Sequence, residues 1–270
     1  MTAQPDPEQP EHAIPAQRRA ALLAAVRARG AASVAELAAM IGVSASTVRR
    51  DLTALERRGL LSRSHGGAAL PDPALSAHEP AMAESAARAA AEKRAIGLAA
   101  AALIAPGASV IFDSGSTVAA AARAALARRI ALTAVTNDLA IAQMLATAET
   151  ARVMTPGGAV RPGSTTILGE PGPAFWAGIH ADVAFVGAHA VAGGWMTDTA
   201  LDFAAAKRAM IAAARRVVAL VDGAKFGQPT FCRIAPVTAL HDLITDAGAP
   251  PAAVQALREA GVAVTVVPLR

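Results

Sequence analysis

Arginine and hydroxyl side chains are concentrated in the first quarter of the chain, where they could bind a polyanion. Residues 16–66 contain nine arginines and three acidic residues, so this segment carries a net charge of +6. The rest of the chain carries −2, since the total is +4. Guanidinium groups bind phosphates and guanine edges through paired hydrogen bonds. This distribution favours nucleic acid as the partner, although a solvated basic surface would have the same charge.

A second group of polar residues follows an expected strand at 109–112 and could bind a small anion. The group precedes a helix expected at 117–127 and consists of Asp113, Ser114, Gly115, Ser116 and Thr117. Backbone N–H groups at a helix N-terminus attract anions, and the hydroxyl groups add further donors. An ordinary turn with a helix cap is the alternative for this segment taken alone.

Three further polar loops are expected at the same edge of a sheet, because each follows another expected strand. One of them contains a glycine pair that permits close backbone approach, and another contains a lysine that could supply a point charge to a phosphate. The residues in and just beyond these loops are Thr136, Asn137, Gly157, Gly158, Arg161, Asp222 and Lys225. Together, the four loops predict a pocket for an anionic metabolite.

Carboxylates in this half of the chain leave an enzyme as an alternative. Isomerising a sugar phosphate requires a general base beside a polarised carbonyl, and the candidates are Asp113, Asp182, Asp198 and Asp202. No two of them have a spacing that indicates catalysis, and Asp182 is expected to be structural. The single cysteine, Cys232, cannot form an internal disulfide, and no Cys/His cluster has metal-ligand spacing. We therefore expect no catalytic residue, metal or cofactor, and the alternative function is a sugar-phosphate isomerase-like enzyme with a DNA-binding appendage.

Caps and apolar spacing in residues 16–66 predict three helices joined by tight turns. Ser33 and Glu36 have the spacing of a capping box, Gly42 provides a turn, and Ser44 is placed to cap the third helix. The helices are expected over 16–29, 34–41 and 45–58, followed by a short β-ribbon, the wing, over 60–66. This pattern predicts a winged helix-turn-helix, whose third helix enters the major groove of DNA.

The third helix divides into a buried face and a face for DNA. Val48, Leu52 and Leu55 recur at the spacing of one apolar stripe, and Arg49 lies off that stripe. Asp51 would repel phosphate, so we expect it to orient Arg50 or a neighbouring side chain. The residues expected at the DNA are Ser33, Ser44, Ala45, Ser46, Thr47, Arg49, Arg50, Arg63 and His65.

The remainder of the chain is expected to form a disordered tail, a linker and an α/β domain. Residues 1–15 are rich in proline and acid, and residues 71–88 are rich in proline. They flank a DNA-binding domain at 16–70, and an effector-sensing domain follows at 89–270. There, apolar runs alternate with helical stretches, which predicts a mostly parallel sheet. Strands are expected at 109–112, 130–135, 152–154, 183–186, 217–221, 243–244 and 262–267, and helices at 117–127, 139–147, 201–215 and 251–260. An alanine-rich helix at 84–102 is expected to dock on this domain or to join subunits.

Several of these motifs resemble the DeoR family of bacterial repressors. The N-terminal ones are Thr47-Val48-Arg49-Arg50-Asp51-Leu52 and His65-Gly66-Gly67-Ala68, and those in the other half lie at 112–117, 135–137, 157–158, 181–187 and 222–227. The resemblance covers about residues 16–268. It implies an α/β sensor domain similar in fold to ribose-5-phosphate isomerase, with a phosphorylated sugar or similar metabolite controlling DNA binding. It also adds Gly187 to the expected effector site. Ala224 and Pro156 depart from the family's pattern.

Partners and location follow from the same observations. Operator DNA and a phosphorylated sugar-type effector are the expected partners, and helix-turn-helix proteins usually bind paired half-sites as oligomers, here a dimer or tetramer. A non-sensing architectural DNA binder would not need the large α/β domain. We expect no secretion signal, because no apolar run follows a basic segment near residue 1. The most apolar stretch, 95–105, is too short to span a bilayer, which needs about 20 residues. We expect a cytoplasmic repressor of carbohydrate metabolism that does not contact a membrane.

Overall fold

The computed structural model describes residues 15–57, 61–64, 66–69 and 89–268, apart from the side chains of residues 27, 28, 57 and 62–64. The chain divides into two compact units, Met1–His78 and Glu79–Arg270. The expected tail and linker fall almost entirely outside the described residues, so the domain boundaries given above stay predictions. No helix of the described part is both long enough and apolar enough to cross a membrane.

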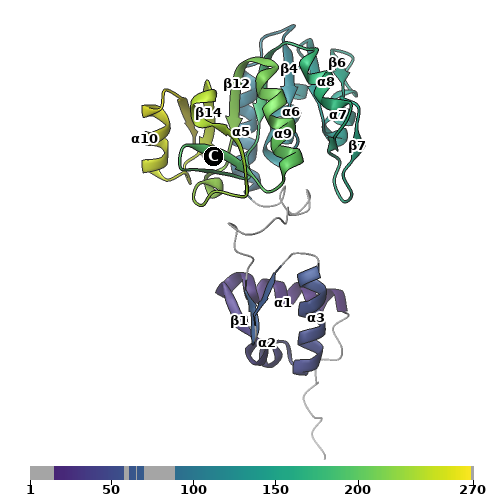
Figure 1. The fold of residues 1–270 in the computed structure, drawn as a ribbon, viewed down its shortest axis with the longest axis vertical. Coiled ribbons are helices and arrows are strands. Elements are labelled where there is room, and N and C mark those ends of the chain that lie inside the picture. The colour runs from purple at the N-terminus through teal and green to yellow at the C-terminus, as the bar shows by residue number, and fades with distance from the viewer. Residues whose placement is uncertain (1–14, 58–60, 65, 70–88, 269–270) are drawn as a thin grey trace, which may run out of the picture. The chain divides into compact units, whose positions relative to one another are not determined.

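The first unit is a three-helix winged helix-turn-helix. Its apolar core includes Leu22, Leu37 and the expected stripe of Val48, Leu52 and Leu55, each at most 2% exposed. The helices are α1 (Pro15–Arg29), α2 (Val34–Ile41) and α3 (Ala45–Arg57), all labelled in Figure 1. The strands are β1 (Ala31–Ser33), β2 (Ser62–Ser64) and β3 (Gly67–Ala69). The helix-turn-helix prediction is therefore confirmed.

Local chemistry explains where α2 begins and ends. The Ser33 hydroxyl accepts a hydrogen bond from the Glu36 N–H at 3.2 Å, and the Glu36 carboxylate accepts one from the Ser33 N–H at 2.7 Å. Gly42 ends α2 with φ of 71°, a conformation that costs glycine little. The capping box predicted from the sequence is thus formed.

The wing differs from the expected ribbon at 60–66. It is an antiparallel sheet in the order β1-β3-β2, so residues 31–33 and 67–69 also belong to it. The expectation missed β1 because a three-residue strand has too short a pattern to recognise. Gly67 allows β3 to approach β1, since a Cβ there would lie 2.3 Å from the carbonyl oxygen of Ala32.

The second unit is built on a seven-stranded parallel sheet, which confirms the predicted α/β class. Buried valines, alanines and phenylalanines form the sheet interior, because strands covered on both faces need apolar side chains on both faces. The strand order is β15-β14-β12-β9-β4-β5-β6. The strands are β4 (Ser109–Phe112), β5 (Leu132–Thr136), β6 (Ala151–Met154), β9 (Ala181–Val186), β12 (Ala214–Leu220), β14 (Asp242–Asp246) and β15 (Ala263–Val267).

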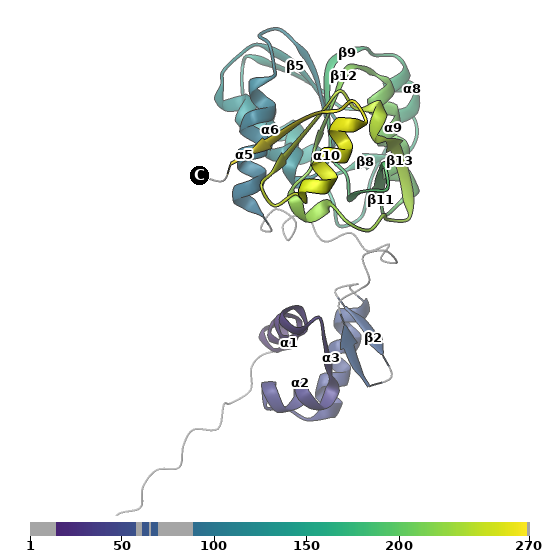
Figure 2. The ribbon, with the colours of Figure 1, turned by 90° about the vertical axis from the view of Figure 1, so that its left-hand side faces the viewer.

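Helices cover both faces of this sheet, over two separate apolar clusters. Figure 2 shows α5 and α6 on one side of the strands and α8 and α9 on the other. The helices are α5 (Ala90–Ala102), α6 (Ser116–Ala127), α7 (Leu139–Leu145), α8 (Gly172–Ala177), α9 (Leu201–Ala212) and α10 (Pro251–Glu259). Of the two roles left open for the alanine-rich helix, its described part, α5, docks on its own unit. Gly97 permits this contact, because a Cβ there would lie 2.6 Å from the backbone of Ala120 on α6.

Several expected boundaries were wrong by a few residues. The helix expected at 201–215 ends at Ala212, and β12 begins at Ala214 rather than at residue 217. The reason is tertiary: residues 214–216 pair with β9, and Arg216 binds Asp242 through two hydrogen bonds of 2.7 and 2.8 Å. Similarly, β5 spans Leu132–Thr136 rather than 130–135, and α7 ends at Leu145 rather than at residue 147.

Short antiparallel elements were missed altogether. A hairpin of β7 (Ala159–Val160) and β8 (Ile167–Leu168) follows β6. A second small sheet contains β10 (Ala190–Ala192), β11 (Trp195–Asp198) and β13 (Cys232–Pro236). The glycine pair Gly193-Gly194, both with positive φ, forms the turn between β10 and β11 and was a hairpin signal that could have been used.

The strand order places a switch point between β4 and β9. From β4 the chain proceeds outwards through β5 to β6, whereas from β9 it proceeds in the opposite direction through β12 and β14 to β15. Ligands of open α/β sheets bind at the carboxyl ends of the strands where the order reverses. The ends of β4 and β9 are therefore where a ligand is to be sought.

Candidate functional site

Helix α3 presents polar and basic side chains at its N-terminal half. The Ser44 hydroxyl accepts a hydrogen bond from the Thr47 N–H at 3.3 Å and lies 2.9 Å from the hydroxyls of Ser46 and Thr47. Ser44, Ser46, Arg49 and Arg50 are exposed, and Ala45 and Thr47 are half-buried. Ser33 is committed to the capping box, the side chain of Arg63 is not described, and His65 lies outside the described residues. The contacts of these residues with DNA stay a prediction. Most of the predicted residues lie together at the N-terminal half of α3.

Asp51 corrects one expectation. It is 5% exposed and binds Arg18 on α1, with 2.5 Å between the Arg18 Nε and a carboxylate oxygen. Arg19 Nε lies 3.5 Å from the other oxygen. Asp51 therefore holds α1 against α3 instead of orienting Arg50, because it lies beside Leu52 on the buried side of the helix. Within the described residues, no ion pair engages Arg49 or Arg50, which leaves both side chains available to DNA.

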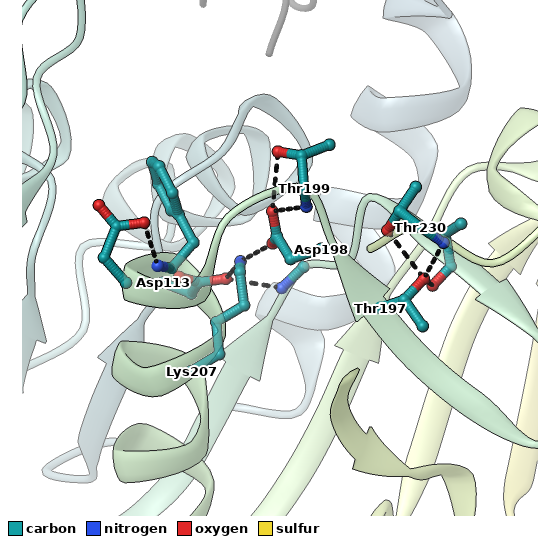
Figure 3. Close-up of polar contacts among 10 residues, drawn as sticks. Asp113, Thr197, Asp198, Thr199, Lys207 and Thr230 are labelled. Atoms are coloured by element: carbon teal, nitrogen blue, oxygen red, sulfur yellow. Dashed lines mark hydrogen bonds and ion pairs between the residues drawn. The ribbon is translucent and has the colours of Figure 1, made fainter. Parts of the chain in front are cut away.

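At the switch point, a buried lysine binds two carboxylates. Asp113 follows β4 and is 1% exposed, and it accepts hydrogen bonds from the Gly187 N–H at 2.9 Å and from the ammonium of Lys207 on α9. The same ammonium lies 3.7 Å from the carboxylate of Asp198 at the end of β11 (Figure 3). Burial raises the pKa of Asp113, and the Lys207 ammonium opposes that rise. The Asp113 carboxylate thus joins the ends of β4 and β9, and the Lys207 ammonium links this carboxylate to the end of β11.

The loop after Asp113 has the geometry of an anion site. Gly115 adopts φ of 127° directly before α6, and within the described residues no side chain caps the helix. The hydroxyls of Ser114, Ser116 and Thr117 have no hydrogen-bond partner among the described residues, although Ser114 and Thr117 are buried. Helix N–H groups without a cap and hydroxyls without partners are the donors that an oxyanion would accept from.

A second buried lysine reaches the carboxyl edge from the other face of the sheet. Lys93 on α5 is 6% exposed, and its ammonium lies 4.0 Å from the carboxylate of Asp222, which follows β12. The carbonyl oxygen of Asp222 accepts a hydrogen bond from the Lys225 N–H at 3.0 Å, which forms the short turn that carries Lys225. The expected residues Asp222 and Lys225 are therefore adjacent, and Lys93 lies beside Asp222.

Among the other expected effector residues, Asn137 and Gly158 contact β8 of the β7–β8 hairpin. The Thr136 hydroxyl accepts a hydrogen bond from the Asp138 N–H at 3.1 Å, and the Asn137 amide donates one to the Ile167 carbonyl at 3.4 Å. A Cβ at Gly157 would lie 2.8 Å from Pro171, and one at Gly158 would lie 2.4 Å from the Leu168 carbonyl. These four residues thus have packing reasons of their own. Their contact with an effector stays a prediction.

The four candidate general bases do not form one catalytic centre. Asp182 accepts hydrogen bonds from the N–H and hydroxyl of Ser109, which lower its pKa, and it is structural as expected. Asp202 accepts one from the Phe203 N–H at 2.9 Å at the start of α9. Asp113 and Asp198 share Lys207, so their charges are already engaged.

Sequence reasoning missed Lys207 and did not single out Lys93 as a site residue. A signal was present, since Phe203, Lys207 and Met210 follow the spacing of the buried stripe of α9. A lysine within such a stripe must find an anionic partner. The reasoning also missed Thr197, whose hydroxyl accepts hydrogen bonds from the N–H and hydroxyl of Thr230, both at 3.0 Å, and anchors the end of β11 (Figure 3).

His189 is a titratable group at this edge and yields a test. The backbone N–H of His189 donates a hydrogen bond to the backbone carbonyl of Thr197 at 2.9 Å, which fixes this residue beside the end of β11. Burial lowers the pKa of His189 and the Lys225 ammonium lowers it further, while Asp198 opposes them. In the unfolded chain the imidazole takes up a proton near its ordinary pKa of 6.5, but in the folded chain only at lower pH. The stabilising effect is therefore present above pH 6.5 and is lost as the pH falls.

Lowering the pH from about 7.5 to about 5.5 should accordingly reduce the free energy of unfolding more in the native protein than in His189→Asn. Urea unfolding at both pH values measures the difference. His180→Asn is the matched control, since His180 is exposed, and it should behave as the native protein does. An equal pH dependence in native protein and His189→Asn would contradict the assignment.

Both units match known families. The DeoR-like helix-turn-helix domain matches residues 18–74, and the DeoR C terminal sensor domain matches residues 88–247. The HTH-type transcriptional regulator YgbI of Escherichia coli (strain K12) is 35% identical over 244 residues, which cover 90% of this chain and 94% of that protein. The glycerol-3-phosphate regulon repressor of the same strain is 30% identical over 246 residues, covering 90% and 95%.

A winged helix-turn-helix joined to an α/β sensor unit defines a DNA-binding transcription regulator. This chain belongs to the DeoR family of such regulators. Among solved structures, ribose 5-phosphate isomerase A from Neisseria gonorrhoeae is similar over 50% of this chain and 53% of its own, with a TM-score of 0.38 and 15% identity.

Proposed function

We propose that this protein is a cytoplasmic repressor of carbohydrate metabolism whose DNA binding is controlled by a phosphorylated sugar-type effector. The observation that carries the proposal is the uncapped N-terminus of α6 at the switch point, where hydroxyls without partners accompany it. Anionic ligands fit such a place because the helix dipole and N–H groups favour negative charge. The name of one relative, a glycerol-3-phosphate regulon repressor, agrees with a phosphate ester as the ligand.

In the proposed complex, Ser114, Ser116 and Thr117 donate to the phosphate, and Lys225 supplies a further positive charge. On the DNA side, α3 enters the major groove of an operator half-site, with a second copy of the chain on the other half-site. The effector acts by binding more tightly to the form of the oligomer whose two α3 helices do not fit the operator. In this proposal the protein represses transcription while it is bound to the operator, and binding of the effector releases it from the DNA.

The test is operator release by defined phosphate esters. The operator is a duplex selected from random DNA by the native protein, and the probes are glycerol 3-phosphate, ribose 5-phosphate and fructose 6-phosphate, each beside its unphosphorylated parent. At least one ester should release the DNA in a gel-shift assay, and no parent compound should. If no ester changes binding, the sensing half of the proposal fails.

The variant Lys225→Gln sharpens this test. Because a hydrogen bond to a charged group contributes about 1.5–3 kcal/mol, the ester concentration for half-release should rise at least about tenfold. Affinity for the operator without ester should stay unchanged. Arg152→Gln is the matched control, since Arg152 is an exposed cation on β6.

The alternative function, an isomerase, predicts turnover of ribose 5-phosphate by the pure protein, and we expect none.

A further inference from the structure

Phe203 is buried in an unusual place. It is 3% exposed, yet it belongs to neither apolar cluster of the second unit. Its ring instead faces a guanidinium, since the Cζ of Arg161 lies 4.7 Å from the ring centroid. This distance is within the range of a cation–π contact. We therefore ask what the aromatic ring does for the arginine, since its position outside the apolar clusters indicates a role other than filling the interior.

The backbone of Arg161 is held at the carboxyl end of β5. Its N–H donates to the Thr166 carbonyl at 2.9 Å, which closes the turn between β7 and β8. Thr166 forms a bridge with Asp138, and the Ile167 N–H donates to the Asn137 carbonyl at 2.7 Å. The hairpin that carries Arg161 is thus fixed to the loop that follows β5.

Phe203 and the anion loop are connected through α9. Phe203 and Lys207 are four residues apart on this helix and so lie on one face. Lys207 binds Asp113, the first residue of the loop that contains Ser114, Ser116 and Thr117. The Arg161 guanidinium therefore lies over a ring that is one helical turn along α9 from Lys207, whose ammonium holds this loop. A guanidinium carries its N–H donors in a fixed planar fork, which suits bidentate binding of phosphate.

We propose that Phe203 is a positioning residue, which holds Arg161 at the carboxyl edge so that the guanidinium pairs with the phosphate group of the effector. The proposal rests on the function proposed above and adds how one of its cations is oriented. Arg161 contacts the ligand, and Phe203 acts through Arg161. The aromatic ring is required, because an aliphatic side chain of similar size would fill the space without attracting the guanidinium.

The experiment measures binding of two probes, inorganic phosphate and ribose 5-phosphate, to the full chain by isothermal titration calorimetry. Phe203→Leu should weaken the binding of both by about two- to thirtyfold, the equivalent of a cation–π contact. Arg161→Gln should weaken it at least as much. Phe203→Tyr retains the ring and should restore the affinity. In the double variant, Phe203→Leu should add no loss to that of Arg161→Gln, because the group it positions is gone.

The control is Phe175→Leu, which removes an aromatic ring from α8, a helix that also contacts α9. Its affinity for both probes should equal that of the native protein. A loss in Phe203→Leu that persists undiminished in the Arg161→Gln background would show a merely structural role and overturn the inference. Equal affinity of native protein and Phe203→Leu would overturn it as well. If the native protein binds neither probe, both the inference and the proposed phosphate site are wrong. In the two outcomes above, by contrast, the native protein binds phosphate and only the role of Phe203 is wrong.

Discussion

Replacing Lys207 with methionine is expected to lower the free energy of unfolding of the second unit by about 3–5 kcal/mol, the range for breaking a buried ion pair from one side. The ammonium is enclosed by Asp113 and Asp198, and the Lys207 side chain is only 5% exposed. Methionine retains an unbranched apolar side chain but leaves two buried carboxylates without a counter-charge. Desolvation of those carboxylates then opposes folding.

Urea unfolding followed by tryptophan fluorescence measures this loss. Both tryptophans, Trp176 and Trp195, lie in the second unit, so their emission reports that unit and not the helix-turn-helix. Lys225→Met is the matched control, since it removes a half-buried lysine whose turn is held by backbone hydrogen bonds. It should cost no more than about 0.5 kcal/mol, as is usual away from buried networks. A loss below about 1 kcal/mol in Lys207→Met would contradict the ion pair as a buried interaction.

The same variant has a pH signature of known sign. Burial already raises the pKa of Asp113, and replacing Lys207 removes the larger of the two opposing influences, leaving only the hydrogen bond from the Gly187 N–H. An acid whose pKa is raised by folding stabilises the folded state at low pH and loses that contribution as the pH rises through the folded pKa. The difference between native protein and Lys207→Met should therefore be largest at neutral pH and shrink as the pH falls. Adding Asp113→Asn and Asp198→Asn to Lys207→Met should recover part of the loss at neutral pH.

Arg49→Ala and Arg50→Ala are expected to weaken operator binding by about 5- to 150-fold if the arginine contacts a base, which corresponds to about 1–3 kcal/mol. Both side chains are exposed on α3, and Asp51 is engaged by Arg18 on α1. The two arginines are thus presented to the DNA without competition from the neighbouring acid. Fluorescence anisotropy with the selected duplex gives the affinities.

Salt dependence separates the two kinds of contact. If an arginine binds a phosphate, its replacement should weaken specific and non-specific DNA alike and reduce the slope of log affinity against log salt by about one. If it reads a base, the loss should be confined to the operator. Arg258→Ala, on α10 of the other unit, should bind both duplexes as the native protein does. Native-like operator affinity in both α3 variants would contradict the assignment of α3 as the recognition helix.

The sequence by itself determined those features that depend on neighbouring residues. The stripe of Val48, Leu52 and Leu55 predicted α3 and its buried face, and Ser33 with Glu36 predicted the start of α2. The strand expected at 109–112 is β4, and the polar loop after it lies at the switch point of the sheet. Each prediction succeeded because the periodicity, cap or turn involved lies within a few residues. Such a pattern can therefore be recognised from the residue types of neighbouring positions alone.

Only the tertiary structure decided which charged groups meet. Lys207 binds Asp113, 94 residues away, and Arg18 binds Asp51, 33 residues away. No local pattern encodes these pairs, since the strand order and the helix packing bring them together. Sequence reasoning therefore did not identify Arg18 as the partner of Asp51, and it missed the buried lysine. The energetic cost of an unpaired buried charge makes the pairing obligatory once the fold is formed, but the fold alone selects the partner.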